Sequence, residues 1–441
     1  MRALLLTAGS QGDVLPFAAL GARLAAAGHD AVLAAPALFG GLAAACGVPF
    51  VPLELDMGQV GEALAGRHGL AHLVTFCRAM GRRVPGVLPG VTQAARLGAD
   101  VVVHHPVLPL GQHCAELLGV PAVVAQPMPA LVPTRQFASA AWPGPVPGPL
   151  NRPSYHAVRV LAGAWCRRDI DRWRRDVLAL PARPGRHDPL RSGGAPVTGP
   201  PARPGRDDPL RSGRGAPVTV LHAYSPHVVP RPADWPATAH VTGYWTLPSG
   251  PDWVPPRRLA EYLDDPDPVV YLGFGSMPGP DPRRLADAIM AAARQIGVRV
   301  LVSSVSPDLR RLLPPGRFLV IRHAPHDWLF PRVQAIVHHG GAGTTGAAVA
   351  AGRPQVIWPF GVDQPFWSRR MADLGVAPPA RPVRALTGAT LAAALGRVLG
   401  DEQMRARAAE LGRRVHAEDG CGRAIDLLAG ITAGSPLAVP A

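Results

Sequence analysis

The chain has 441 residues, of which 47% are hydrophobic and 17% charged, and this composition excludes a disordered chain and predicts two folded domains of ordinary size. Its formal net charge of +14 comes from arginine alone, because the sequence contains no lysine, and the arginines are spread along the chain without a basic tract. We therefore expect no nucleic-acid partner and a membrane association that is at most peripheral.

Cysteine usage and the N-terminal residues indicate a protein of the cytoplasm. The five cysteines are widely spaced, odd in number and without a CxxC motif, so we expect mostly buried thiols and no metal site. The first apolar run ends at Gln11, too early for a signal peptide, and the Ala-rich stretch 17–46 is broken by charged residues such as Arg23 and Asp30, which excludes a membrane span. We expect a monomer or a weak homodimer.

Apolar runs alternate with helical patterns through the first half of the chain. We predict strands at 3–8, 31–35, 51–53, 101–103 and 122–124, a helix from Pro16 to about Ala27 and another at 38–46. This alternation is typical of a parallel sheet covered on both faces, in which ligands bind beyond the carboxyl ends of the strands. Asp13 and the pair His104–His105 follow two of these strands, so we expect them on one functional rim.

The middle of the chain is rich in proline and contains a duplication. Residues 126–153 are predicted to be irregular, and residues 154–178 to form one amphipathic helix. The segment 182–219 holds two near-identical copies with a period of 20 residues, which indicates a recent duplication in a surface loop that does no chemistry. A strand at 218–223 is expected to be the last of the first half, and a proline-punctuated connector follows at 226–256.

The second half repeats the alternation around a glycine-rich turn. We predict strands at 269–274, 299–303, 318–321, 335–337 and 355–358, helices at 282–296 and 344–351, and further helices to about Leu428. The turn at 339–344 lies between a strand and a helix, where backbone N–H groups and the helix dipole favour a phosphate group. The alternative is a tight turn that binds no ligand, as found in any doubly wound sheet.

Four motifs carry a resemblance to a known family: GSQGDVLPF at 9–17, VYLGFGSM at 270–277, PHDWLFPRVQAIVHHGGAGTT at 325–345 and AGRPQVIWPFGVDQPFW at 351–367. The chain resembles the family 1 glycosyltransferases of GT-B fold, and within them the sterol glucosyltransferases and the bacterial antibiotic glycosyltransferases of glycopeptide type. The resemblance implies two Rossmann-like, doubly wound α/β domains that face a cleft. These would be an acceptor-binding domain at 1–243, a linker at 244–256 and a nucleotide-sugar-binding domain at 257–441, whose final helices pack back on the first domain.

The resemblance also implies a reaction. A sugar, glucose or a deoxysugar, would move with inversion from a UDP- or dTDP-sugar to a hydroxyl group of a lipophilic acceptor, with no metal, no covalent intermediate and no cofactor besides the donor. Asp13 matches the family's base position and would take the acceptor proton. A carboxylate with an ordinary pKa of about 4 is a weak base, so we expect partial burial to raise the pKa of Asp13. The structural alternative is that Asp13 only caps the helix near Pro16.

The donor contacts implied by the resemblance lie mainly in the second half. The turn that begins at His339 would hold the diphosphate, the turn at 275–276 would reach a phosphate, and residues 325–328 would line the nucleobase. His338 is set apart, because neighbouring strand-end side chains point in opposite directions. The expected donor contacts are Ser10, Gly12, Gly275, Ser276, His326, Trp328, His339, Gly341, Ala342, Gly343, Thr344, Asp363 and Gln364.

Several of these residues have a structural alternative. Asp363 and Gln364 match the family's sugar-binding pair but could cap the following helix, and Trp328 could pack in the core. Ala347 stands where many UDP-sugar enzymes of the family have a ribose-binding Glu, which fits a dTDP donor without a 2′-hydroxyl group. Sterol-type enzymes share this substitution and use UDP-glucose, and the PHDWLFP motif favours that donor, so both nucleotides stay open.

The predicted acceptor is a secondary metabolite or antibiotic aglycone, and a sterol- or hopanoid-type lipid is the alternative. Two alternatives belong to other functional classes: a sugar-nucleotide epimerase of similar fold and a non-catalytic sugar-nucleotide-binding protein. A dinucleotide-binding oxidoreductase is disfavoured, because no GxGxxG motif follows the first predicted strand.

Overall fold

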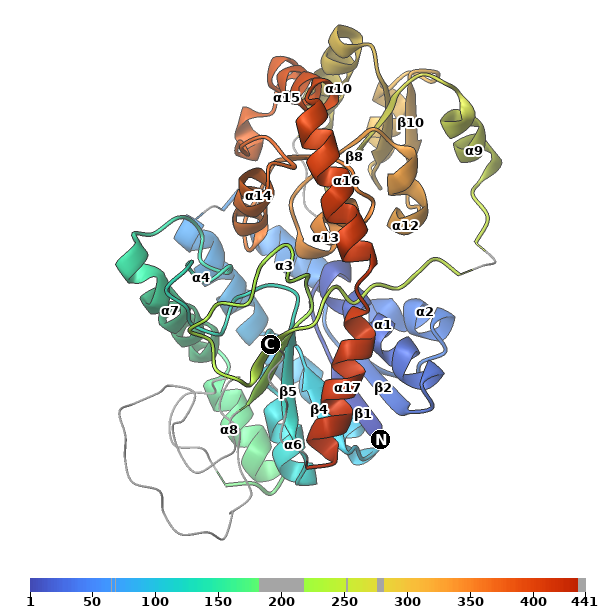
Figure 1. Cartoon of the computed structure of the whole chain (residues 1–441). Coiled ribbons are helices and arrows are strands. Elements are labelled where there is room, and N and C mark those ends of the chain that lie inside the picture. The colour runs from blue at the N-terminus through green and yellow to red at the C-terminus, as the bar shows by residue number, and fades with distance from the viewer. Residues whose placement is uncertain (65, 68, 182–217, 251–252, 276–280, 435–441) are drawn as a thin grey trace. The chain divides into compact units, whose positions relative to one another are not determined.

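The computed structural model describes residues 1–434 except 65, 68, 182–217, 251–252 and 276–280, and the chain divides into two units (Figure 1). The N-terminal unit comprises residues 1–226, 230–247 and the segment from Asp419 onwards, and the C-terminal unit comprises residues 227–229 and 248–418. The duplication at 182–219 lies, up to residue 217, outside the described residues, so its lack of chemistry stays a prediction.

The N-terminal unit is built on a seven-stranded parallel sheet with the strand order β3-β2-β1-β4-β5-β6-β7. Its strands are β1 (Arg2–Leu6), β2 (Asp30–Pro36), β3 (Phe50–Leu53), β4 (Val101–His104), β5 (Ala122–Gln126), β6 (Thr219–His222) and β7 (Ala239–Val241). The predicted parallel sheet is confirmed. The prediction that the strand at 218–223 is the last of this half is wrong, because β7 follows it. Three residues in a proline-rich connector are too few to show a strand period.

Helices cover both faces of this sheet. They are α1 (Gln11–Ala26), η1 (Ala37–Phe39), α2 (Gly40–Ala45), α3 (Met57–Leu64), α4 (Gly69–Gly81), α5 (Val84–Arg96), α6 (Gly111–Leu118), η2 (Gly148–Leu150), α7 (Asn151–Ala164), α8 (Arg167–Asp176) and α17 (Gly420–Thr432). The prediction of a single helix at 154–178 is wrong, because the helix is interrupted at Trp165 and Cys166, between α7 and α8. Val158 of α7 packs in a small separate cluster, whereas Ile170 and Trp173 of α8 turn into the main core, and one straight helix could not bury both sets.

The residues of β1 show how the sheet is buried on both sides. Leu4 and Leu6 pack on one face with side chains of α5 and α6, and Leu5 packs on the other face with Phe17 of α1. Ile425 and other residues of α17 join the cluster that contains Phe17, so the C-terminal helix lies beside α1 (Figure 1). All five cysteines are free thiols and four of them are buried, as expected from their spacing.

The C-terminal unit is built on a five-stranded parallel sheet with the order β10-β9-β8-β11-β12. Its elements are α9 (Arg257–Asp264), β8 (Val269–Gly273), α10 (Pro282–Ile296), β9 (Arg299–Ser303), α11 (Pro307–Leu312), β10 (Phe318–Ile321), α12 (His326–Leu329), η3 (Phe330–Arg332), β11 (Ala335–His338), α13 (Ala342–Ala350), β12 (Gln355–Ile357), α14 (Gln364–Asp373), η4 (Val383–Ala385), α15 (Gly388–Gly400) and α16 (Glu402–His416). The predicted strands and the helix at 282–296 are confirmed. Both faces of the sheet are buried, since Val270 and Leu272 pack on one face and Val269 and Tyr271 on the other.

Candidate functional site

Both sheets have a switch point, where the strand order reverses, and predicted site residues follow the strands that flank it. In the N-terminal unit the strands run outward from β1 to β3 and resume at β4 beside β1, so Asp13 follows one flanking strand and His105 the other. In the C-terminal unit β8 and β11 flank the switch point, and they are followed by Gly275 and His339. Ligands of open α/β sheets bind at such points.

Asp13 lies in the first turn of α1, because this helix begins at Gln11 and not near Pro16 as predicted. Ser10 is the N-cap residue, and its N–H and Oγ–H groups donate to Asp13 Oδ2 at 2.8 and 3.1 Å. This pairing of the cap with the third helical residue starts the helix upstream, and Pro16 is accommodated inside it. The alternative that Asp13 caps a helix near Pro16 is therefore wrong in position, although Asp13 does support the helix start. Gly12, half-buried, lies between Ser10 and Asp13.

Gly9 leaves the space that the Asp13 carboxyl group occupies. Its φ angle is 130°, and a Cβ atom at this position would lie 2.2 Å from Asp13 Oδ2. Any other residue at position 9 would therefore be strained and would displace the carboxyl group.

The half-buried position of Asp13 gives its carboxyl group the pKa of a base that works near neutral pH. Its side chain is 24% exposed. Burial raises the pKa of Asp13 from 3.8 to about 6, and the hydrogen bonds from Ser10 partly oppose this rise. The expected rise in pKa is confirmed. At pH 7 the carboxyl group is ionised in most molecules, and it is a stronger proton acceptor than the carboxylate of an ordinary aspartate.

His105 is the second titratable side chain at this point of the sheet. Its Nε2 atom lies 3.6 Å from Asp13 Oδ1, and its side chain is fully buried. Its backbone N–H donates to the carbonyl oxygen of Leu6 at 2.8 Å, which ties the residue to the end of β1. The expected common rim is therefore confirmed for His105. The ring of His104 packs instead against Gly111 of α6, where a Cβ atom would come within 2.4 Å of it.

The first turn of α13 forms the centre of the candidate phosphate site. The helix begins at Ala342, two residues before the predicted start, with Gly341 as the N-cap residue. Ala342, Gly343 and Thr344 therefore fill the first turn, and their N–H groups have no acceptor within the helix. This geometry is able to bind a phosphate group. Ser276, predicted to reach a phosphate, lies outside the described residues.

Two glycines make room for the imidazole ring of His339. A Cβ atom at Gly275 would lie 3.1 Å from its Cε1 atom, and one at Gly341 would lie 2.5 Å from its Nε2 atom. Burial lowers the pKa of His339 to about 4, so the ring is neutral at pH 7. Its Nδ1 atom is buried and has no hydrogen-bond partner among the described residues. Within the described residues, the Nδ1 atom of His339 is thus a polar atom of the candidate phosphate site without a hydrogen-bond partner.

His338 has a structural role, as the alternation of side chains along a strand predicts. Its Nδ1 atom accepts a hydrogen bond from the Gly340 N–H at 3.0 Å, so its Nε2–H donates to Gln355 Oε1 at 2.8 Å. The side chain is fully buried. His338 therefore fixes the shape of the turn and does not reach its ligand side.

Asp363 and Gln364 stand at the start of α14, where both side chains bind the protein itself. Gln364 is buried, and its Oε1 atom accepts from the N–H groups of Phe360 and Gly361 at 2.7 and 3.2 Å. Asp363 is the N-cap residue, but its carboxyl group makes no cap; its Oδ2 atom accepts from Trp367 Nε1 at 2.8 Å. The capping alternative is therefore wrong for the two side chains, which shape the loop before α14. Their contact with a sugar stays a prediction.

The predicted nucleobase wall is built around aromatic contacts. The ring of His326 stacks on Phe330 with a centroid distance of 4.1 Å, and burial lowers its pKa to about 4. Trp328 is half-buried: its ring lies 4.9 Å from that of Trp253, and the guanidinium group of Arg332 lies 4.3 Å from it. The core-packing alternative for Trp328 is thus partly correct, since these contacts leave part of the ring exposed.

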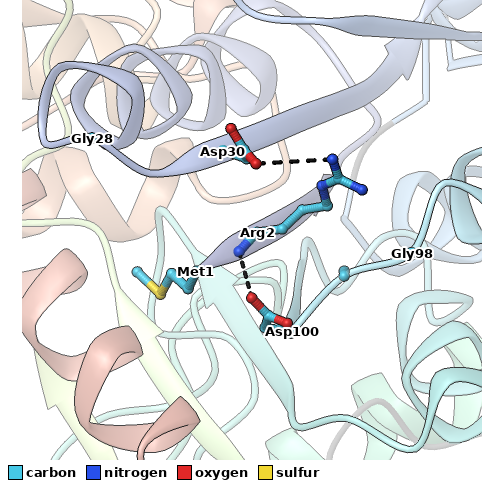
Figure 2. Close-up of a pocket in the computed structure, with 7 residues that line it drawn as sticks. Met1, Arg2, Gly28, Asp30, Gly98 and Asp100 are labelled. Atoms are coloured by element: carbon cyan, nitrogen blue, oxygen red, sulfur yellow. Dashed lines mark hydrogen bonds and ion pairs between the residues drawn. The ribbon is translucent and has the colours of Figure 1, made fainter.

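A surface pocket of about 440 Å³ lies at the amino ends of β1, β2 and β4, opposite the ends that Asp13 and His105 follow (Figure 2). Its lining includes Arg2, Asp30 and Asp100, and the Arg2 N–H donates to Asp100 at 2.7 Å. None of the predicted site residues lines it, so it is not the candidate site.

In the parts of the chain that the structure describes, no helix is long and apolar enough to cross a membrane, and no group of His, Cys, Asp or Glu side chains could hold a metal ion.

The set of predicted contacts omits Gly9 and the direct approach of His105 to Asp13. The sequence holds a signal for both residues. Gly9 comes shortly after β1, and His105 comes directly after β4, the strand that pairs with β1. The distance between the histidine and the carboxyl group depends on the register of the two strands, which periodicity does not give.

Comparison with known proteins relates both units to sugar-transferring enzymes. Residues 287–422 match a family described as Erythromycin biosynthesis protein CIII-like, C-terminal domain. The chain is 32% identical, over 97% of its length, to a sterol 3-beta-glucosyltransferase of Neosartorya fischeri, of which it spans 29%. It is 30% identical, over 96% of its length, to a sterol 3-beta-glucosyltransferase of Arabidopsis thaliana, of which it spans 66%. The chain therefore spans less than two thirds of these relatives.

Solved structures of glycosyltransferases share the fold. The glycotransferase of kitacinnamycin aligns with a TM-score of 0.67 and 19% identity, over 98% of this chain and 98% of that chain. The glycosyltransferase VinC in complex with DTDP aligns with a TM-score of 0.64 and 20% identity, over 99% of this chain and 100% of that chain. The predicted fold class, GT-B with two Rossmann-like parallel-sheet units, is confirmed.

Proposed function

We propose, because this chain belongs to the family 1 glycosyltransferases of GT-B fold, that it transfers a sugar from a UDP- or dTDP-sugar to a hydroxyl group of a lipophilic acceptor. The observation that carries the proposal is the Asp13 carboxyl group, half-buried at the switch point of the N-terminal sheet and with its pKa raised to about 6. Such a group can take a proton from a neutral hydroxyl group as that oxygen attacks the anomeric carbon.

The two carboxylate oxygens of Asp13 have different roles in the proposed reaction. Ser10 donates two hydrogen bonds to Oδ2 of Asp13, so Oδ1 is the oxygen left to receive the acceptor proton. The acceptor oxygen forms a bond to the anomeric carbon as the bond from that carbon to the diphosphate breaks. One displacement of this kind inverts the configuration and needs no covalent intermediate. We propose that the reaction uses no metal and no cofactor besides the donor.

The leaving diphosphate gains negative charge as its bond to the anomeric carbon breaks, so it requires hydrogen-bond donors. We propose that the N–H groups of Ala342, Gly343 and Thr344 bind it at the N-terminus of α13, together with the neutral imidazole of His339. A neutral imidazole donates one hydrogen bond, and the buried Nδ1 atom of His339 has no partner in the part of the chain that the structure describes. We also propose that Ser10, Gly12, Gly275 and Ser276 lie near the donor, and that His326 and Trp328 line the nucleobase. Asp363 and Gln364 complete the proposed donor site, with their loop held by the contacts described above.

Two different relatives support the proposed donor nucleotide and the proposed acceptor. DTDP is bound in the related VinC structure, and Ala347 of this chain offers no carboxylate to a ribose 2′-hydroxyl group. The sterol 3-beta-glucosyltransferases are named for sterol acceptors and glucose. We therefore propose a lipophilic acceptor, either a secondary metabolite or a sterol- or hopanoid-type lipid. We further propose a cytoplasmic protein that is a monomer or a weak homodimer, with at most a peripheral membrane contact.

The proposal is tested by transfer assays with UDP- and dTDP-sugars and a panel of lipophilic alcohols, with products detected by mass. Release of nucleotide that requires the acceptor supports transfer, whereas a changed sugar without an acceptor would show epimerisation. Asp13→Asn should keep its affinity for UDP or dTDP and lose at least about 1000-fold in transfer rate, because the amide cannot accept the proton. Asp30→Asn makes the same chemical change at an exposed side chain and should retain full activity. Near-normal turnover of the Asp13 variant would remove the base from the mechanism.

A further inference from the structure

We propose that His105 is a positioning residue for Asp13: a buried, neutral imidazole that directs its Nε2–H to Asp13 Oδ1, fixes the orientation of the carboxyl group and favours its ionised form. The proposal rests on the proposed role of Asp13 as the base. It assigns His105 no contact with the substrate.

The hydrogen-bond partners of His105 determine which ring nitrogen carries the proton. The backbone N–H of Val107 donates to Nδ1 at 3.3 Å, so Nδ1 is the acceptor and the proton is on Nε2. Nε2 is buried and has no hydrogen-bond partner within the described residues. The acceptor that it faces is Asp13 Oδ1, at 3.6 Å. This separation is slightly longer than a hydrogen bond. A small movement that shortens it would give the buried Nε2–H group an acceptor, which is energetically favourable.

The surroundings of His105 keep it neutral. Its side chain is fully buried, and burial lowers its pKa to about 3. The ring of Phe17 on α1 packs edge-to-face with the imidazole of His105, with a centroid distance of 6.0 Å. The titratable groups next to His105 among the described residues are Asp13 on α1 and His104 on β4, and burial lowers the pKa of His104 to about 4. The pair of Asp13 and His105 therefore carries at most one charge between pH 5 and 8.

These features separate His105 from a proton relay. Nδ1 already accepts a hydrogen bond, and Nε2 already holds the proton, so the imidazole has no free lone pair for a proton from Asp13. The two carboxylate oxygens are then held from two sides, Oδ2 by Ser10 and Oδ1 by His105. Each oxygen has two lone pairs, so Oδ1 can receive the acceptor proton while His105 donates to it.

The first test uses the pH dependence of kcat/KM for transfer. His105→Phe removes the donor but keeps an aromatic ring of similar size, and His105→Gln keeps an N–H group near the position of Nε2. Losing a donor to the ionised form raises the pKa of Asp13, so the acid limb of His105→Phe should move up by about one pH unit. The acid limb of His105→Gln should stay close to that of the wild type. An unmoved limb in the Phe variant, or an equal shift in both variants, would refute the positioning role.

The second test uses the unsubstituted protein and needs neither turnover nor a variant at position 105. In protein labelled with ¹⁵N-histidine, NMR should show the His105 proton on Nε2, and the Nε2 shift should change with pH as Asp13 titrates. Asp13→Asn should abolish this change. A proton on Nδ1, or an Nε2 shift that ignores Asp13, would overturn the proposal. A protein that shows the NMR coupling but transfers no sugar would refute the proposed function and leave the pairing of His105 with Asp13 intact.

Discussion

Replacing Asp13 by asparagine should stabilise the N-terminal unit at neutral pH, in contrast to its effect on transfer. Burial raises the pKa of Asp13 from 3.8 to about 6, so the folded protein holds this proton more tightly than the unfolded chain does. The stability contributed by the protonated group is fully present below pH 3.8 and is lost as the pH rises through about 6. Since one pH unit corresponds to about 1.4 kcal/mol, ionisation of Asp13 costs about 3 kcal/mol by pH 8.

The assay is urea unfolding of the wild type and Asp13→Asn at about pH 4 and about pH 8, followed by tryptophan fluorescence. The asparagine variant does not titrate, so its gain in free energy of unfolding over the wild type should be about 2.4 kcal/mol larger at the higher pH, since at pH 4 the unfolded chain is already partly ionised. Asp30→Asn, whose side chain is 76% exposed in the wild type, is the matched control and should show no such difference. An equal effect of the Asp13 substitution at the two pH values would show that ionising this carboxyl group does not lower the free energy of unfolding.

Two further substitutions test the candidate phosphate site and the core. Gly341→Ala would place a Cβ atom 2.5 Å from His339 Nε2, so calorimetry should show at least a tenfold loss of affinity for UDP or dTDP; Gly400→Ala, where a Cβ meets nothing within 4 Å, should bind normally. Retained affinity in Gly341→Ala would exclude His339 from the site. Arg174→Met removes the fully buried guanidinium group that binds both carboxylate oxygens of Glu116 at 2.8 and 3.0 Å. Its free energy of unfolding should fall by about 3 kcal/mol in urea, and a loss below about 1 kcal/mol would contradict a structural role for this ion pair.

The sequence predicts most of the fold, because the strands of a parallel sheet are buried on both faces and appear as short apolar runs. The helix α10 begins and ends as predicted, since Asp281 caps it, Pro282 fills its first position and Gly297 ends it. The start of α1 is predicted wrongly for a related reason. Pro16 is typical of a first helical turn, but the pairing of Ser10 with Asp13 is the stronger start signal.

Prediction of the site is limited by the direction of side chains. The sequence places Gln364 next to a helix start, but only the structure shows that its Oε1 atom faces the N–H groups of its own loop. The alternation of strand side chains does separate His338 from His339, because both lie at the end of one strand. The approach of His105 to Asp13 depends on the pairing of β1 with β4, which joins residues almost 100 positions apart in the chain.

The position of α17 has a consequence for how the protein is made. Its residues Cys421, Ala424, Ile425 and Leu428 complete the hydrophobic cluster around Phe17, so the core of the N-terminal unit includes residues that the ribosome adds only after the whole C-terminal unit. The C-terminal unit ends at Glu418 and can fold before α17 is released. The unit that is translated first is therefore the one that finishes folding last, and until then part of its apolar surface is open to chaperones.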